Sequence, residues 1–299
     1  MKPLAIVACS SIFITTLLGL APARACSCSG QGPASALTRP DQTWGVRLSE
    51  RLVLGNGAFN AHGEHAAFAP HEHDRTVEYG LLSAYRWQRL ELSSTFSYGA
   101  RSAAISAQSE RSVGFGDTTL RARYEAASEP EPWQTGIYPG LAMLGSVRLP
   151  TANARGLAPR GLGATEFALG VVLERALSPL FRAGLVAEIA GRLPDTSLGI
   201  TRRLGPRASA EFTLSYFATP DWVLSALLGL RWEGNASLRQ REQRGTAQRT
   251  TELGAAVSWQ PWASAFRAGF AERYAPAVDQ LGANTVQSAT SEFWVGYVR

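Results

Sequence analysis

All four histidines of the 299-residue chain lie close together, in His62-Gly63-Glu64-His65 and His71-Glu72-His73-Asp74. His-x-x-His and His-x-His spacings each allow two imidazoles to reach one ion, and carboxylates stand beside both pairs. Imidazole ligands favour copper, zinc or nickel over calcium or magnesium. The pattern therefore raises the hypothesis of a divalent transition-metal site, whose ligands would be His62, His65, His71 and His73.

Two other interpretations of the histidine cluster stay open. The segment is also typical of a solvated polar loop, and imidazoles titrate near neutral pH, so that proton sensing is a third hypothesis. A hydrolytic zinc helix is excluded, because there is no His-Glu-x-x-His and Pro70 would break a helix.

Enzyme chemistry has little support elsewhere in the chain. Because every histidine lies in one segment, no Ser/His/Asp arrangement can be assembled on other elements. There is no phosphate-binding loop and no dinucleotide fingerprint. We therefore expect no catalytic residues, and no cofactor beyond the hypothetical transition metal.

The first 25 residues have the features of a secretory signal peptide. Lys2 is followed by an apolar run from Leu4 to Leu20 and by Ala21-Pro22-Ala23-Arg24-Ala25, which is an Ala-x-Ala cleavage pattern. A retained membrane anchor is the alternative, but the run is short for a spanning helix. We expect residues 1–25 to be removed and the mature chain to begin at Cys26.

Cys26 and Cys28 open a segment, residues 26–43, that is rich in Gly, Pro, Ala and Ser. Lipidation of Cys26 is one interpretation, and a Cys-x-Cys pair for a soft metal is another. The interpretation we favour is a flexible periplasmic tail with two thiols. Removal of Lys2 and Arg24 changes the formal charge from +5 to +3, which gives no indication of a nucleic-acid partner.

The elements that must position any site are strands. Between residues 207 and 232 apolar and polar residues alternate with a period of two, in two runs joined by Ala218-Thr219-Pro220-Asp221. The second run places Trp at both ends of its apolar face and Leu and Ala between them. That order is typical of a strand that crosses a bilayer. Its apolar face consists of Trp222, Leu224, Ala226, Leu228, Leu230 and Trp232.

The pattern recurs along the chain and predicts twelve strands. Their expected ranges are 44–53, 77–87, 89–98, 117–126, 137–149, 164–175, 181–193, 207–217, 222–233, 250–260, 264–274 and 288–298. The connections between them alternate between long and short, with one exception, the Pro-rich link from Ala127 to Gln134. The long ones are expected at 54–76, 99–116, 150–163, 194–206, 234–249 and 275–287.

Short periplasmic turns that alternate with longer outer loops are typical of outer-membrane barrels. We therefore predict an all-β fold, a transmembrane antiparallel up-and-down β-barrel of about 12 strands over residues 44–299, in the bacterial outer membrane. Both termini should lie in the periplasm, with 54–76 and 234–249 at the cell surface and 218–221 and 260–263 in the periplasm. Expected partners are outer-membrane lipid and the barrel assembly machinery.

Charged residues fall on the polar face of nearly every predicted strand. That face should line the interior of the barrel. The residues that we predict to line the lumen are Arg182, Glu188, Arg231, Glu252 and Arg267. Because both signs are present, weak ion selectivity is the expectation.

A resemblance to a known family is carried by three segments: Gly114-Phe115-Gly116-Asp117-Thr118, Val147-Arg148-Leu149-Pro150-Thr151 and Gly161-Leu162-Gly163. Together they resemble the outer-membrane family named after the meta-pathway of phenol degradation, which is distantly akin to long-chain fatty-acid channels. The resemblance implies a channel for aromatic or other hydrophobic molecules and brings no catalytic residues. From the residues alone, we expect Gly116-Asp117 to mark the start of a strand, with Asp117 bonded to local backbone.

Two main functional hypotheses follow. The first is an outer-membrane channel or transporter for small, hydrophobic or aromatic solutes. The alternative is a metal-linked outer-membrane protein that binds Cu, Zn or Ni through a surface loop rich in histidine. A purely structural or adhesive barrel is a third.

Overall fold

The structure is a computed structural model. It describes residues 42–59, 64–105, 108–127, 139–152, 158–197, 200–219, 221–239, 241–243, 246–261, 264–276 and 285–299. The predicted signal peptide, nearly all of the tail with Cys26 and Cys28, and His62 lie outside these residues. No helix in the described part of the chain is long and apolar enough to cross a membrane.

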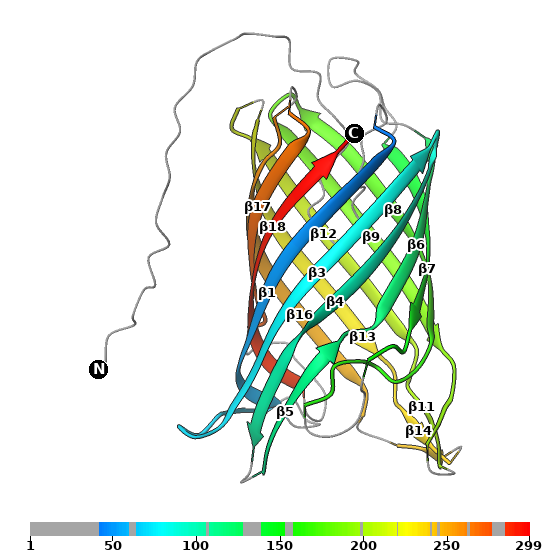
Figure 1. The fold of residues 1–299 in the computed structure, drawn as a ribbon, viewed down its shortest axis with the longest axis vertical. Helices are drawn as coiled ribbons and strands as arrows, with labels where there is room; N and C mark the ends of the chain where they lie inside the picture. Colours follow the sequence, from blue (N-terminus) through cyan, green and yellow to red (C-terminus); the bar gives the residue numbers. More distant parts are fainter. Residues whose placement is uncertain are drawn as a thin grey trace.

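Twelve antiparallel strands form a closed barrel, because each pairs with the next and the last pairs with the first (Figure 1). They are β1 (Trp44–Phe59), β3 (His73–Trp87), β4 (Leu90–Ile105), β6 (Thr118–Ala127), β7 (Gly140–Leu149), β8 (Glu166–Ser178), β9 (Phe181–Arg192), β12 (Arg207–Phe217), β13 (Trp222–Glu233), β16 (Gln248–Trp259), β17 (Phe266–Tyr274) and β18 (Thr285–Val298). Each overlaps one predicted strand, so the predicted fold and strand number are confirmed.

The two ends of the barrel differ (Figure 1). At one, the short-turn end, β3 and β4 are joined by Gln88 and Arg89, and the chain enters and leaves the barrel. There the backbone N–H of Thr43 donates to the carbonyl of Arg299 at 2.6 Å. The other, the long-loop end, carries the longer connections that the alternation of loop lengths predicted, except that the connection from β6 to β7 at the short-turn end is also long.

At the long-loop end the predicted loop boundaries were wrong, because the strands continue further. β1 and β4 extend to Phe59 and Ile105, and β2 (His65–Ala67) and β5 (Gln108–Phe115) add to the same sheet. Four more strands form a separate sheet, namely β10 (Asp195–Ser197), β11 (Ile200–Arg203), β14 (Ser237–Leu238) and β15 (Arg241–Glu242). These hairpins pair backbone N–H and C=O groups that a loop would leave to water.

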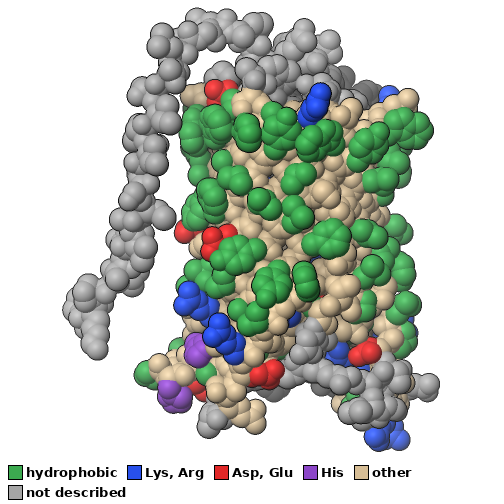
Figure 2. All heavy atoms as spheres, in the orientation of Figure 1, with side chains coloured by type: hydrophobic (Ala, Val, Ile, Leu, Met, Phe, Trp, Pro, Cys, Tyr) green, Lys and Arg blue, Asp and Glu red, His purple; other side chains and the backbone are tan. Residues whose placement is uncertain are grey.

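The outer wall of the barrel is apolar. Figure 2 shows hydrophobic side chains over most of the visible wall, with basic side chains and histidines gathered toward the long-loop end. Large side chains such as Leu169 (69% exposed) and Ile189 (67%) point outward with no protein partner over them. So continuous an exposed apolar surface would favour aggregation in water, whereas a bilayer covers it.

An apolar hollow of about 1280 Å³ lies on this outer wall. Its lining includes residues that face outward by parity, such as Leu120, Phe167 and Trp232, and two inward-facing arginines, Arg121 and Arg207.

Candidate functional site: the charged lumen

The inward face of the barrel carries charged side chains from nearly every strand. Antiparallel pairing determines which of them lie side by side, because directly paired residues on neighbouring strands point to the same face of the sheet. We call such side-by-side residues a level of the lumen. Glu188 on β9 pairs with Ser209 on β12, which pairs with Arg231 on β13. Residues distant in sequence are therefore brought to one level of the lumen.

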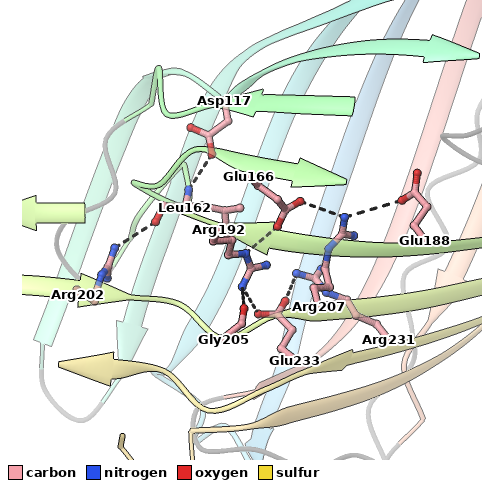
Figure 3. Close-up of polar contacts among 10 residues, drawn as sticks. All are labelled: Asp117, Leu162, Glu166, Glu188, Arg192, Arg202, Gly205, Arg207, Arg231 and Glu233. Atoms are coloured by element: carbon pink, nitrogen blue, oxygen red, sulfur yellow. Dashed lines mark hydrogen bonds and ion pairs between the residues drawn. The ribbon is translucent and has the colours of Figure 1, made fainter. Parts of the chain in front are cut away.

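Figure 3 shows a central charge cluster, built from side chains of β8, β9, β12 and β13. Its core is Arg192, whose Nε donates to Glu166 at 2.7 Å and whose Nη1 donates to Glu233 at 2.8 Å. Glu166 also accepts from Nη2 of Arg207 at 3.0 Å. The side chains of Arg192 and Glu166 are only 0% and 3% exposed, so these charges are compensated by one another and not by water.

The same cluster extends toward the middle of the lumen through Glu188. This carboxylate lies 3.8 Å from Arg207 and 3.6 Å from Arg121 on β6. Arg231 forms an ion pair with Glu233. We define the central charge cluster as Arg121, Arg148, Glu166, Glu188, Arg192, Arg207, Arg231 and Glu233, including Arg148 because it lies directly opposite Glu166 on the neighbouring strand.

A second group of ion pairs closes the lumen toward the short-turn end. Arg86 contacts Glu125 at 3.2 Å, and Arg123 contacts Glu174 at 3.7 Å. All four of these side chains are buried. Water is therefore excluded from these groups, and the interior is narrow at this level.

Toward the long-loop end the lumen becomes wetter. The side chains of Arg51, Arg231 and Glu252 are 47%, 46% and 42% exposed. The lumen at the long-loop end thus combines solvated charges with buried ones such as Arg160 and Arg192, whereas the ion pairs described above toward the short-turn end are all buried.

One loop folds inward at the long-loop end and narrows the mouth. We call residues 158–163 the inward loop. Ala158 is fully buried, and its carbonyl accepts from Oγ of Ser112 at 2.6 Å. Nη1 of Arg101 donates to the carbonyl of Pro159 at 3.0 Å, and Nη2 of Arg202 donates to that of Leu162 at 3.1 Å.

Asp117 fixes the inward loop from the opposite side. Its carboxylate accepts from the backbone N–H of Leu162 at 2.8 Å and from that of Ala152 at 3.3 Å. A side chain at Gly161 would collide with this carboxylate. The predicted strand start after Gly116-Asp117 is correct, but the expectation of a local bond was wrong, because both donors lie at least 35 residues away. The segments that carry the family resemblance thus bind each other.

The five residues expected to line the lumen lie in different surroundings. Glu188 and Arg231 belong to the central charge cluster. Glu252 lies 3.9 Å from Arg273, and Arg267 donates to the side chain of Gln42 at 2.7 Å. Arg182 is buried.

Sequence reasoning missed Arg192, the most buried member of the cluster, although its parity is that of Arg182 and Glu188. It is the last residue of its strand, where the alternation of apolar and polar residues gives the least information. The position of the inward loop gave no sequence signal beyond its glycines.

The structure does not gather the described histidines into one site. His65 lies in β2, His71 in a turn, and His73 begins β3 with Nε2 2.9 Å from Oγ of Ser102. Within the described residues, no three His, Cys, Asp or Glu side chains are placed to hold a metal. Because His62, Cys26 and Cys28 lie outside them, metal binding stays a prediction.

Comparison with known proteins identifies the architecture. No protein-family model and no curated protein sequence matches the chain. Among solved structures, the COG4313 outer membrane channel from Pseudomonas putida F1 superposes with a TM-score of 0.75 at 16% identity, over 90% of this chain and 99% of that one.

Two further structures are more distant. The NanC porin has a TM-score of 0.49 at 11% identity, over 85% of this chain and 98% of that one. A deletion mutant of the TodX monoaromatic hydrocarbon channel has a TM-score of 0.48 at 10% identity, over 86% and 90%. The superposition on the first of these three structures shows a shared fold, a closed antiparallel β-barrel.

Proposed function

We propose that the protein is an outer-membrane channel that passes small solutes, hydrophobic or aromatic ones among them, through the lumen. The observation that carries the proposal is the contrast between the two faces of the barrel. The outer wall is apolar, whereas the interior is charged and opens to water at the long-loop end. A barrel that served only as an anchor has no need of a hydrated, charged interior.

Apolar groups inside the barrel support the passage of solutes that are partly hydrophobic. Ala142, Leu144 and Val172 form one inward cluster, and Leu227, Ala256 and Ala271 form another on the other side. Both lie on the inward face by parity. These side chains are buried, and they make the inward face partly apolar between its charged groups.

The proposal includes an orientation. The long-loop end would face the cell exterior and both termini the periplasm, as is usual for bacterial barrels. The inward loop would then limit solute size at entry, and the buried ion pairs near the short-turn end would form the tightest passage.

Liposome swelling with the refolded, full-length mature barrel tests the channel. We expect liposomes that contain the protein to swell in isosmotic solutions of small solutes such as benzyl alcohol or glycerol, and not in raffinose. Empty liposomes give the background. Swelling no faster than this background with every solute would show that the barrel is not a channel.

A further inference from the structure

The central charge cluster contains more positive than negative groups. Its five guanidinium groups, on Arg121, Arg148, Arg192, Arg207 and Arg231, face three carboxylates, on Glu166, Glu188 and Glu233. Nearer the mouth, Arg101 pairs with Asp74, and Glu78 pairs with both Arg51 and Arg160. The central charge cluster is thus a positively charged part of the lumen wall.

The carboxylates present do not satisfy every donor of the cluster. Nε of Arg121, Nε of Arg207 and Nη2 of Arg192 are buried and have no hydrogen-bond acceptor among the residues that the structure describes. Glu188 lies 3.6 Å from Arg121 and 3.8 Å from Arg207, which is beyond hydrogen-bonding distance. Leaving such donors unsatisfied is costly, and a further anion would reduce that cost.

The cluster can be reached from the wetter end of the lumen. Arg231 is half exposed and lies on the same level as Ser209 and Glu188. Arg207 and Arg231 repel one another as like charges, so an anion bound between these two guanidinium groups would relieve the repulsion. Arg231 is more exposed than Arg121, Arg192 and Arg207.

Buried apolar side chains lie next to the cluster. Leu144 pairs with Gly170, and Gly170 pairs with Glu188, so Leu144 lies two strands away on the same level. Its neighbours Ala142 and Val172 belong to the same buried apolar group. A ligand with a negative group and a small apolar body matches this arrangement better than a neutral hydrocarbon does.

We propose that the central charge cluster is a binding site for small carboxylates with an apolar body, held through Arg121, Arg207 and Arg231. The inference deepens the proposed channel function by assigning the class of solute. It also replaces the expectation of weak ion selectivity with a preference for anions.

Titration calorimetry on the refolded mature barrel in detergent tests the site with benzoate and benzyl alcohol, which share a ring and differ in charge. We expect benzoate to bind at least about tenfold more tightly than benzyl alcohol. Arg231→Gln should lower the affinity for benzoate about tenfold, as expected for loss of a hydrogen bond between charged groups. Arg75→Gln, which removes the same charge from the exposed outer face of β3, should change nothing.

Equal affinities for benzoate and benzyl alcohol, or equal effects of Arg231→Gln and Arg75→Gln, would overturn the anion site. Because Arg231 is half exposed and pairs only with Glu233 among the described residues, its loss should leave the barrel folded. Liposome swelling separates the two proposals. Swelling without a preference for benzoate contradicts the site alone, and benzoate binding that needs Arg231 but occurs without swelling contradicts the channel alone.

Discussion

At the scale of single residues, charged side chains that lie far apart in the sequence form connected ion pairs in the structure. Arg192 illustrates this, because it binds both Glu166 and Glu233 and is itself shielded from water. Ion pairs of this kind are not evidence of high stability, since desolvation opposes the attraction. Removal of one partner, however, leaves a buried charge without compensation.

Arg192→Leu should therefore lower the free energy of unfolding by about 3–5 kcal/mol, because Glu166 and Glu233 lose their main partner. Urea unfolding of the barrel in lipid vesicles measures this loss. Arg175→Leu, on the exposed outer face of β8, is the matched control and should change stability by less than about 1 kcal/mol. Similar losses for both variants would contradict the buried network.

The anchoring of the inward loop by Asp117 gives a second prediction. Asp117→Ala removes the acceptor for the N–H groups of Leu162 and Ala152, so residues 158–163 should loosen at the mouth. We expect faster liposome swelling and a larger permitted solute size. Gly161→Ala, whose new methyl group collides with the carboxylate of Asp117, should act in the same direction. Unchanged solute limits in both variants would show that the loop does not restrict the lumen.

At the scale of the elements, alternation alone was sufficient to predict the twelve barrel strands, since one face of each must be apolar and the other polar. It did not predict how far strands such as β1 and β4 continue beyond the membrane. Outside the bilayer no face is required to be apolar, so the pattern disappears while the backbone still pairs. The short hairpins β10–β11 and β14–β15 went unrecognised for the same reason.

Strand parity on β13 can be tested with two adjacent residues. Leu228 faces outward, and Leu228→Arg should cost about 2–4 kcal/mol near the middle of the membrane. Gly229 faces the lumen, where an added Cβ would lie at an ordinary 3.5 Å from Cβ of Glu252, so Gly229→Ser should be tolerated. Urea unfolding in lipid vesicles compares the free energies of unfolding of the two variants. Equal losses would show that the parity assigned to β13 is wrong.

At the scale of the whole molecule, the contacts across the lumen depend on closure of the barrel. Arg121 and Glu188 lie on β6 and β9, and no local pattern indicates that they meet. Sequence analysis therefore predicted which residues face inward, but not that some of them meet in the central charge cluster.

In the described part of the barrel, the outer wall has two acidic exceptions, Glu50 on β1 and Glu272 on β17, which are exposed. Figure 2 shows acidic side chains among the apolar ones on that face.

The orientation of the molecule in the membrane is a further prediction. An epitope inserted after Gln243, at the long-loop end, should be labelled on intact cells. An epitope after Asp221, in the turn between β12 and β13, should be labelled only after permeabilisation. The opposite result would mean that the barrel is inserted the other way.

The central claim is that solutes pass through the charged lumen, and flux through a deliberately obstructed barrel tests it most directly. Ser209 and Ala210 are neighbours on β12 with opposite parity: Ser209 lies on the inward level of Glu188 and Arg231, and Ala210 faces lipid. We predict that Ser209→Trp reduces liposome swelling in small solutes at least about fivefold, whereas Ala210→Trp leaves it unchanged, because only the first substitution fills the path. Equal swelling rates for the two variants, at equal amounts of folded barrel, would contradict the account.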